Sequence, residues 1–90
     1  MKALKPTMRE KKRYLYLTGK DLKRNVPKAI SDFIGQLGAS EASVHFIEAN
    51  ENSAIISINR EALEKVKASL ALSKERIEVT KVSGTIKGLN

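Results

Sequence analysis

The 90-residue sequence contains no cysteine and a single histidine, His45. The absence of cysteine excludes disulfides, thiolate nucleophiles and cysteine-ligated zinc sites, and it is consistent with a reducing compartment. His45 has no second histidine or cysteine to complete a metal site, so we assign it no chemistry and predict no metal ligands. Apolar runs stay well short of the ~20 residues of a membrane span, and no signal-peptide pattern precedes the first predicted strand. We therefore expect a soluble, cytoplasmic protein.

Motifs that carry catalysis are also missing. Gly19 and Lys20 alone do not make a glycine-rich phosphate loop. Glu61 and Glu64 lie three residues apart on a predicted helix, but their basic neighbours favour a solvated ion-pair face over an acid and base pair. We therefore predict no catalytic residues and no cofactor bound by the protein itself.

Aromatic residues are scarce, at 4% of the chain, so the core should consist mainly of Leu, Ile and Val. With 41% apolar and 30% charged residues, the composition is that of a globular protein. A single domain of this length buries only a little over about 60% of its unfolded surface. We therefore expect modest stability and a role for a partner in supporting it.

The net charge of +7 is unevenly distributed. Residues 1–28 contain ten Lys and Arg but only two acidic residues, Glu10 and Asp21, which gives a net charge of +8. The rest of the chain has a net charge of −1. Such segregation is typical of a surface that binds nucleic acid or an anionic membrane, and nucleic acid is the interpretation we favour. A basic tail that only keeps the protein soluble is the alternative.

The stretch from Arg9 to Thr18 joins this basic charge to an alternating apolar segment. Its first half, which Glu10 alone offsets, carries the cations Arg9, Lys11, Lys12 and Arg13. In the second half, alternation places Leu15 and Leu17 on one face of a strand and two tyrosines, Tyr14 and Tyr16, on the other. We predict a basic arm that leads into the first strand, with the leucines in the core.

Further elements follow from periodicity and turn residues. Turn-forming residues lie within 19–25, and we predict that a helix follows, with Pro27 in its first turn and Gly38 at its end. The apolar stripe predicted for this helix consists of Val26, Ala29, Ile30, Phe33, Ile34 and Leu37. Strands over 43–48 and 54–58 form a hairpin around the turn 50–52, and the second of them should be central. A second helix, capped by Asn59, carries the stripe Ala62, Leu63, Val66 and Leu70, and a last strand covers 76–82 before Gly84.

The order β-α-β-β-α-β predicts an α+β, ferredoxin-like (RRM-like) two-layer sandwich. In that fold two helices cover one face of a four-stranded antiparallel sheet, and the other face lies open. We divide the chain into a basic arm (1–12), one sandwich domain (13–84) and a short tail (85–90). On the open face, Tyr14 and Tyr16 could stack bases or fill a protein interface. The third strand lacks the aromatics of the common RNA-recognition module, so both readings stay open.

Three segments of the chain resemble the archaeal ribonuclease P protein component 2 family. They are KPTMREKKRYLYL (5–17), NREALEKVKASLAL (59–72) and KVSGTIK (81–87). The resemblance implies a non-catalytic, RNA-binding subunit of the ribonucleoprotein that removes the 5′ leader from precursor tRNA. In that complex, magnesium bound by the RNA performs the cleavage. The implied partners are the ribonuclease P RNA, precursor tRNA indirectly, and protein component 3, in a heterodimer that can double to a heterotetramer.

The same resemblance implies which residues bind RNA. The match to the family's arm and closing motif carries over Arg9, Lys11, Lys12, Arg13, Tyr14, Lys81, Ser83, Gly84, Thr85 and Lys87. A Ser-Gly-Thr turn flanked by lysines can offer hydroxyls and backbone donors to a phosphate. Relatives usually continue into a basic helical extension, whereas this sequence stops at Asn90, so contacts made by such a helix are not expected here.

Two other functional classes share the predicted sandwich. An acylphosphatase-type enzyme has its size and a basic phosphate site, but the glycine-rich cradle of that enzyme is not found in this sequence. A dimeric regulatory module would instead bury the open sheet face against a second copy and bind a small metabolite. Hydrolysis of an acyl phosphate, or a thermal shift with a metabolite and no affinity for RNA, would favour these alternatives.

Overall fold

Strand β1, Lys12–Gly19, lies in the middle of the sheet in the computed structural model, which describes residues 12–89. On one side β1 pairs antiparallel with β3, Ser53–Asn59, and on the other with β4, Ile77–Ser83. Strand β2, His45–Ala49, pairs with β3 at the sheet edge, so the strand order is β2-β3-β1-β4. This topology confirms the predicted ferredoxin-like sandwich, with β3 central as expected.

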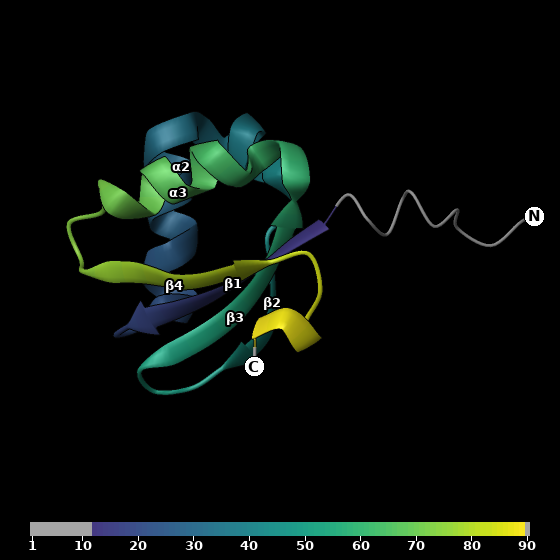
Figure 1. Cartoon of the computed structure of the whole chain (residues 1–90). Coiled ribbons are helices and arrows are strands. Elements are labelled where there is room, and N and C mark those ends of the chain that lie inside the picture. Colours follow the sequence, from purple (N-terminus) through teal and green to yellow (C-terminus); the bar gives the residue numbers. More distant parts are fainter. Residues whose placement is uncertain (1–11, 90) are drawn as a thin grey trace, which may run out of the picture.

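The two helices pack on the same face of the sheet (Figure 1). They are α2, Leu22–Ala42, which follows β1, and α3, Leu63–Ala71, which precedes β4. Of the described residues outside the sheet, those of a short 3₁₀ turn, η2, Lys87–Leu89, lie beside the strands on the opposite face (Figure 1). The sheet therefore has a closed face under the helices and an open face, which are the names used below.

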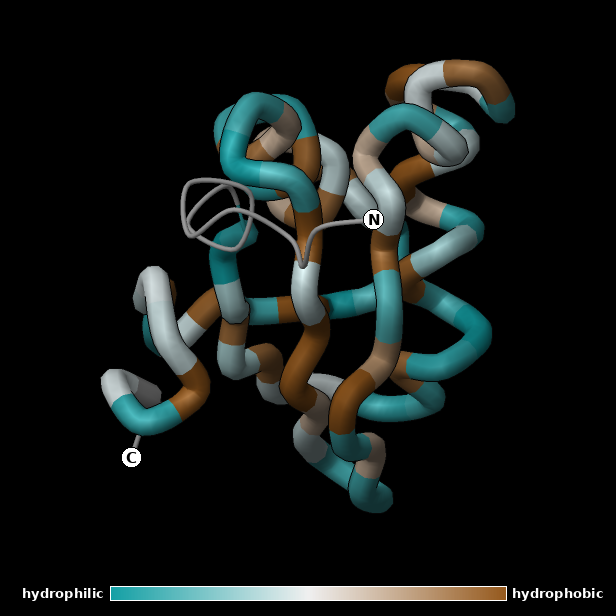
Figure 2. Tube along the Cα trace, turned by 90° about the vertical axis from the view of Figure 1, so that its right-hand side faces the viewer, coloured by the Kyte–Doolittle hydropathy of each residue, from teal (hydrophilic) through white to brown (hydrophobic). Residues whose placement is uncertain are grey.

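Alternation along the central strands sorts side chains between these two faces. Leu15 and Leu17 of β1 are fully buried on the closed face, as are Ile56 and Ile58 of β3. Tyr14 and Tyr16, which alternate with the leucines, lie half-buried on the open face. Figure 2 shows the same switching between hydrophobic and hydrophilic residues along the strands. The predicted assignment of leucines to the core and tyrosines to the other face is confirmed.

Helix α2 begins earlier than its turn residues predicted. It starts at Leu22, so Pro27 lies inside the helix rather than in its first turn, and that prediction was wrong. The carbonyl of Asp21 accepts hydrogen bonds from the backbone N–H groups of Arg24 and Asn25, at 3.1 and 2.8 Å. The buried Asn25 side chain donates to the carbonyl of Lys20 at 2.9 Å. Residues that were predicted to form a turn thus start the helix: the carbonyl of Asp21 accepts its first backbone bonds, and the side chain of Asn25 ties it to Lys20.

A kink at Gly35, not an end at Gly38, interrupts α2. Gly35 has φ 78° and ψ 170°, a conformation that is accessible mainly to glycine, and the helix then continues to Ala42. It ends at Ser43, which is left-handed at φ 56° and donates its backbone N–H to the carbonyl of Ser40. The prediction that Gly38 ends the helix was therefore wrong.

Two members of the stripe predicted for α2 are not in the core. Val26 and Ile30 are fully buried as predicted, whereas Phe33 is 48% exposed and Leu37 is 74% exposed. Phe33 borders a hollow between the helices, where α3 presents the small Ser69 and stops at Ala71. Leu37 follows the kink at Gly35, which turns the later residues away from the original stripe.

The remaining elements agree closely with their patterns. The backbone N–H of Asn50 donates to the carbonyl of Ser53 at 2.7 Å and closes the predicted hairpin turn. A bulge between Phe46 and Glu48 leaves Ile47 44% exposed at the sheet edge. A 3₁₀ turn, η1, Arg60–Ala62, leads into α3, where Val66 and Leu70 are buried as predicted. Asn59 precedes η1 but makes no side-chain capping hydrogen bond, so the predicted cap was wrong.

Candidate nucleic-acid interface

Antiparallel pairing between β1 and β4 places the start of β1 beside the closing motif. Tyr14 lies opposite Ser83, and Tyr16 lies opposite Lys81. A bulge in β4 separates these pairs from the rest of the ladder, and Thr80 at the bulge donates its hydroxyl to the carbonyl of Tyr16 at 2.8 Å. Residues separated by more than sixty positions in the sequence therefore share one patch on the open face.

Arg13 also reaches the closing motif. A β-carbon placed on Gly84 would lie 3.5 Å from the Nη1 atom of Arg13, an ordinary van der Waals distance. The same guanidinium nitrogen donates to the carbonyl of Lys12 at 3.0 Å. Of the described glycines, only Gly19 and Gly35 have a positive φ, so Gly84 is not required here by backbone conformation. Its small size leaves space beside the guanidinium.

The Ser-Gly-Thr turn is organised by its own hydroxyls. The backbone N–H of Thr85 donates to Oγ of Ser83 at 3.1 Å, and that of Gly88 donates to Oγ1 of Thr85 at 3.1 Å. Both hydroxyl oxygens thus accept bonds from the chain that follows, and each O–H remains able to donate. The N–H of Thr85 is occupied, so the turn would offer a phosphate hydroxyl donors more readily than that amide.

Lysines border this turn and face solvent. Lys81 and Lys87 are exposed, the first on β4 and the second at the start of η2. Lys12 lies at the other end of the patch, where its amine donates to Oδ1 of Asn59 at 3.1 Å. Arg9 and Lys11 lie outside the described residues. The predicted site residues that the structure describes are Lys12, Arg13, Tyr14, Lys81, Ser83, Gly84, Thr85 and Lys87, and they occupy neighbouring positions on β1, β4 and the tail.

Apolar surface continues from this patch across the open face. Tyr16 lies opposite Ile55 of β3, and both are only partly buried. Ile86 in the tail is 44% exposed. A half-covered band of this kind, next to cations, suits contact with a macromolecule better than binding of a small molecule.

Asn59 is a residue of this region that sequence reasoning assigned to another role. Besides accepting from Lys12, its side chain donates through Nδ2 to the carbonyl of Glu41 at 2.7 Å. It therefore links the start of β1 to the last turn of α2. A polar residue before a helix predicts a cap, and no local signal in the sequence indicates a partner 18 or 47 residues away.

The described part of the chain offers little catalytic chemistry. Within residues 12–89 no group of three or more His, Cys, Asp or Glu side chains could hold a metal ion. Oγ of Ser43 lies 3.3 Å from Nε2 of His45, a nucleophile and base pairing in principle, but the contact is exposed at the sheet edge. Surface contacts of this kind lack the excluded water and the orienting third group that nucleophilic catalysis needs. None of the described helices is both long and apolar enough to cross a membrane.

Comparisons with known proteins identify the family of this chain. The family model described as Rpp14/Pop5 family matches residues 3–90. Ribonuclease P protein component 2 of Methanococcus maripaludis strain C7 is 33% identical over 101 residues, covering 97% of this chain and 78% of the relative. Proteins of the same name from Methanocaldococcus jannaschii and Thermococcus gammatolerans are each 34% identical, covering 97% and 98% of this chain and 75% and 87% of the relatives. Because the family model spans nearly the whole chain and the relatives align along most of their own length, this chain belongs to the Rpp14/Pop5 family.

Proposed function

We propose that this chain is an RNA-binding protein subunit of ribonuclease P, which supports the RNA-catalysed removal of the 5′ leader from precursor tRNA. The name shared by its relatives, ribonuclease P protein component 2, supports the assignment to that complex. The observation that carries the RNA-binding role is the pairing of the basic arm strand with the closing motif, which puts Tyr14 opposite Ser83. The protein itself contributes binding and positioning, and magnesium on the partner RNA supplies the catalytic metal.

Phosphates are the groups that this patch is best suited to bind. Lys12, Lys81 and Lys87 are cations around the turn, and Arg13 lies beside Gly84 with its planar guanidinium. Phosphate contacts of this kind give affinity and orientation without reading sequence. The half-buried ring of Tyr14 adds a face on which an unpaired base can stack. Together these features favour a structured RNA over a small anion as the ligand.

Protein component 3 is the proposed protein partner, and the apolar band of the open face is its proposed contact surface. Ile55 and Tyr16 are only partly buried there, and Ile47 at the neighbouring edge is 44% exposed. A partner that binds only the folded chain raises its apparent stability. We therefore expect mixing with component 3 to raise the melting temperature and shift the elution volume. Unchanged values would reject this part of the proposal.

The salt dependence of RNA affinity tests the main proposal. If about five phosphates are neutralised, a single-strand slope of ~0.7 per contact gives a slope near −3.5 in log affinity against log salt. A fourfold rise in salt then weakens binding by roughly two orders of magnitude. Replacing Lys11, Lys12 and Arg13 by alanine should reduce affinity for the ribonuclease P RNA and flatten the slope by about 2, with folding retained.

A control variant separates the effect of where the cations lie from the effect of how many there are. Replacing Arg60, Lys65 and Lys67 by alanine removes the same number of cations from η1 and α3, where all three are exposed. This control should keep a slope near that of the unaltered protein. If the salt slope flattens equally in both variants, the arm contributes only general positive charge. If the unaltered protein has no affinity for the RNA, the proposed function is overturned.

A further inference from the structure

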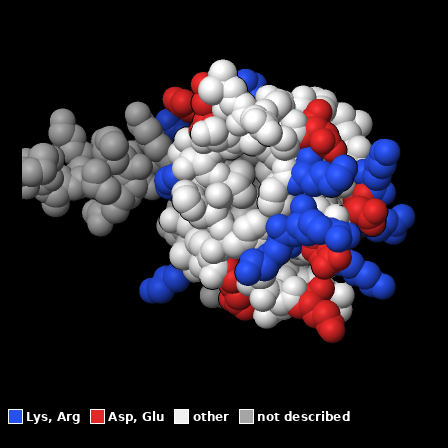
Figure 3. Space-filling view, turned by 180° about the vertical axis from the view of Figure 1, so that it is seen from behind, with Lys and Arg blue, Asp and Glu red and all other residues white. Residues whose placement is uncertain are grey.

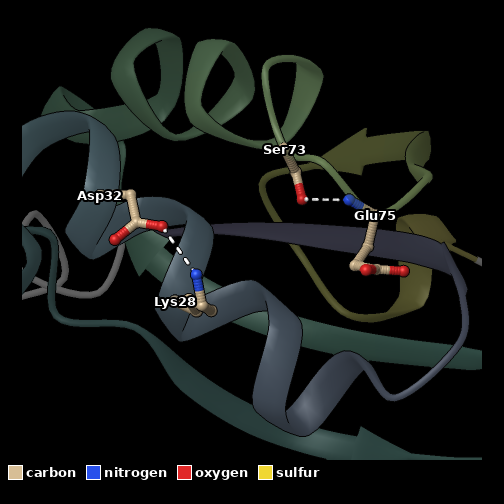
Figure 4. A network of polar contacts seen from close by, with 4 residues as sticks. All are labelled: Lys28, Asp32, Ser73 and Glu75. Atoms are coloured by element: carbon tan, nitrogen blue, oxygen red, sulfur yellow. Dashed lines mark hydrogen bonds and ion pairs between the residues drawn. The ribbon is translucent and has the colours of Figure 1, made fainter.

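A hollow of about 540 Å³ lies on the helix side of the molecule, outside the patch described above. It is lined by the first half of α2, by the end of α3 and by the segment that leads to β4. Figure 4 shows this region, with Lys28 and Asp32 on α2 and Ser73 and Glu75 on the segment after α3. The family assignment does not account for this hollow, which was not predicted from the sequence.

Cations from two elements surround the hollow. Arg24 and Lys28 come from α2, and Lys74 comes from the segment after α3. An adjoining hollow shares Glu75 and adds Lys20 and Arg76, so the two together are lined by five cations against three carboxylates, Asp32, Glu75 and Glu78. Figure 3 shows basic side chains gathered along one side of the molecule with acidic ones between them. The cations of residues 1–28 thus include those of the basic arm and also Lys20, Arg24 and Lys28, which line the two hollows.

The ion pairs at this rim are weak and leave the cations available. Nζ of Lys28 lies 3.2 Å from Oδ2 of Asp32, with both side chains about two-thirds exposed. Nη2 of Arg24 lies 3.5 Å from Oδ2 of Asp21, and these side chains are 79% and 68% exposed. Solvent screens such pairs, so a phosphate with its own negative charge can compete for the same cations.

Phe33 supplies the second chemical feature. It lines the hollow and is 48% exposed, and Leu72, also in the lining, is 68% exposed. An aromatic face next to a cationic rim is the combination by which proteins hold single-stranded nucleic acid, since the base stacks on the ring while its phosphates meet the cations. Neither an uncharged apolar groove nor a basic surface without an aromatic ring would have this property.

From this combination we propose that the hollow between α2 and α3 is a second RNA contact, in which an unpaired nucleotide stacks on Phe33 and its phosphates lie against Arg24, Lys28 and Lys74. The proposal rests on the RNA-binding function proposed above and assigns a further site on the helix layer, away from the open face of the sheet. The RNA is thereby held on two sides of the domain. The excess of cations in the lining is the observation that favours RNA over a protein segment.

The absence of tryptophan from the chain gives this site a direct reporter. Phe33→Trp places a single indole in the hollow, and Leu37→Trp places one four residues later on the same helix, at a 74% exposed position outside the lining. A single-stranded oligouridylate and the full ribonuclease P RNA serve as probes of the full-length protein. Stacking should quench the fluorescence of the Phe33→Trp protein strongly with both probes and leave that of Leu37→Trp almost unchanged.

Affinity gives the independent measurement. Phe33→Ala should weaken binding of the oligouridylate about tenfold, the lower part of the range for losing one stacked base. Lys28→Ala with Lys74→Ala should lower the salt slope by about 1 to 1.4, whereas Lys65→Ala with Lys67→Ala, exposed positions of α3 outside the hollow, should not. Circular dichroism of each variant checks that the fold is retained.

The outcomes distinguish this site from the function as a whole. If the unaltered protein binds the RNA with a steep salt slope but Phe33→Trp is not quenched and Phe33→Ala binds normally, the second contact is rejected and the proposed function stands. If component 3 and not RNA changes the fluorescence of Phe33→Trp, the hollow is a protein interface and the inference is overturned. If the unaltered protein binds neither probe, the second contact and the proposed function are both rejected.

Discussion

The two faces of the sheet are made from the same strands and have opposite properties. On the closed face the side chains of Leu15, Leu17, Ile56 and Ile58 are fully buried beneath the helices. On the open face Tyr14, Tyr16 and Ile55 alternate with them and remain partly exposed. Burial of apolar area is the main stabilising contribution to folding, so the closed face supplies most of the stability. The open face contributes less to folding and is the surface proposed above for partners.

The largest expected effect comes from comparing two adjacent isoleucines of β3. Ile56→Ala removes a fully buried side chain from the closed face and should lower the free energy of unfolding by about 3 kcal/mol, within the usual range for such truncations. Ile55→Ala, one residue away on the open face, should cost about 1 kcal/mol or less because its side chain is already partly solvated. Urea denaturation of both variants measures the difference.

That pair of variants also tests the assignment of the faces. Reversed magnitudes would mean that β3 is turned over relative to the helices, since a shift of one residue exchanges the two faces of a strand. Equal, large losses would mean that the open face is covered in the protein as it exists in solution, for example by a second copy of the chain. Gel filtration at the same concentration shows whether a second copy of the chain is bound.

Much of the fold could be predicted from the sequence because its local patterns and its tertiary packing agree. The alternation in β1 and β3 and the spacing of Val66 and Leu70 in α3 depend only on strand and helix periods, and each matches the observed burial. Helix α2 departs from its pattern for tertiary reasons. The kink at Gly35 leaves Leu37 uncovered, and the shortness of α3 leaves Phe33 uncovered. The sequence of α2 alone predicts neither exposure.

The candidate site was predictable only in part. The sequence identifies the basic arm and the closing motif separately, and the resemblance assigns both to RNA binding. Their contact depends on which strands are neighbours, since Tyr14 meets Ser83 only if the last strand lies beside the first. The roles of Asn59 and Phe33 were missed because hydrogen bonds to distant carbonyls and hollows between helices leave no local signature.

The second largest effect is expected at the kink in α2 that leaves Leu37 uncovered. Gly35→Ala introduces a side chain where φ is 78° and ψ is 170°, and a β-carbon there meets no atom within 4 Å, so any cost is conformational. We expect a loss of about 1–3 kcal/mol in the free energy of unfolding. Gln36→Ala, at the exposed neighbouring position, should change it by at most about 0.5 kcal/mol. Thermal unfolding of the two proteins gives the comparison, and a stabilised Gly35→Ala protein would show that a straight helix is preferred.

A smaller effect is expected at Asn59, which ties the end of β3 and the start of β1 to the last turn of α2. Asn59→Ala removes the hydrogen bonds to the carbonyl of Glu41 and from the amine of Lys12, at 2.7 and 3.1 Å. Both bonds are partly exposed to solvent, so we expect a loss of about 1 kcal/mol. Amide hydrogen exchange should become faster at the end of α2 and the start of β1, while the centre of β3 stays protected. Uniformly faster exchange would contradict a local role.

The smallest effect on global stability is expected on the open face, where the tail packs against β4. A β-carbon on Gly88 would collide with Oγ of Ser83, so Gly88→Ala should displace η2 and break the bond from its N–H to Oγ1 of Thr85. Because neither Lys87 nor Gly88 belongs to the core cluster, the free energy of unfolding should change by less than about 1 kcal/mol. Tryptic cleavage after Lys87, identified by mass spectrometry, should become several-fold faster. Gly84→Ala is the matched control, since its added carbon makes only an ordinary contact with Arg13, and equal cleavage rates in the two proteins would show that the tail does not depend on its packing against Ser83.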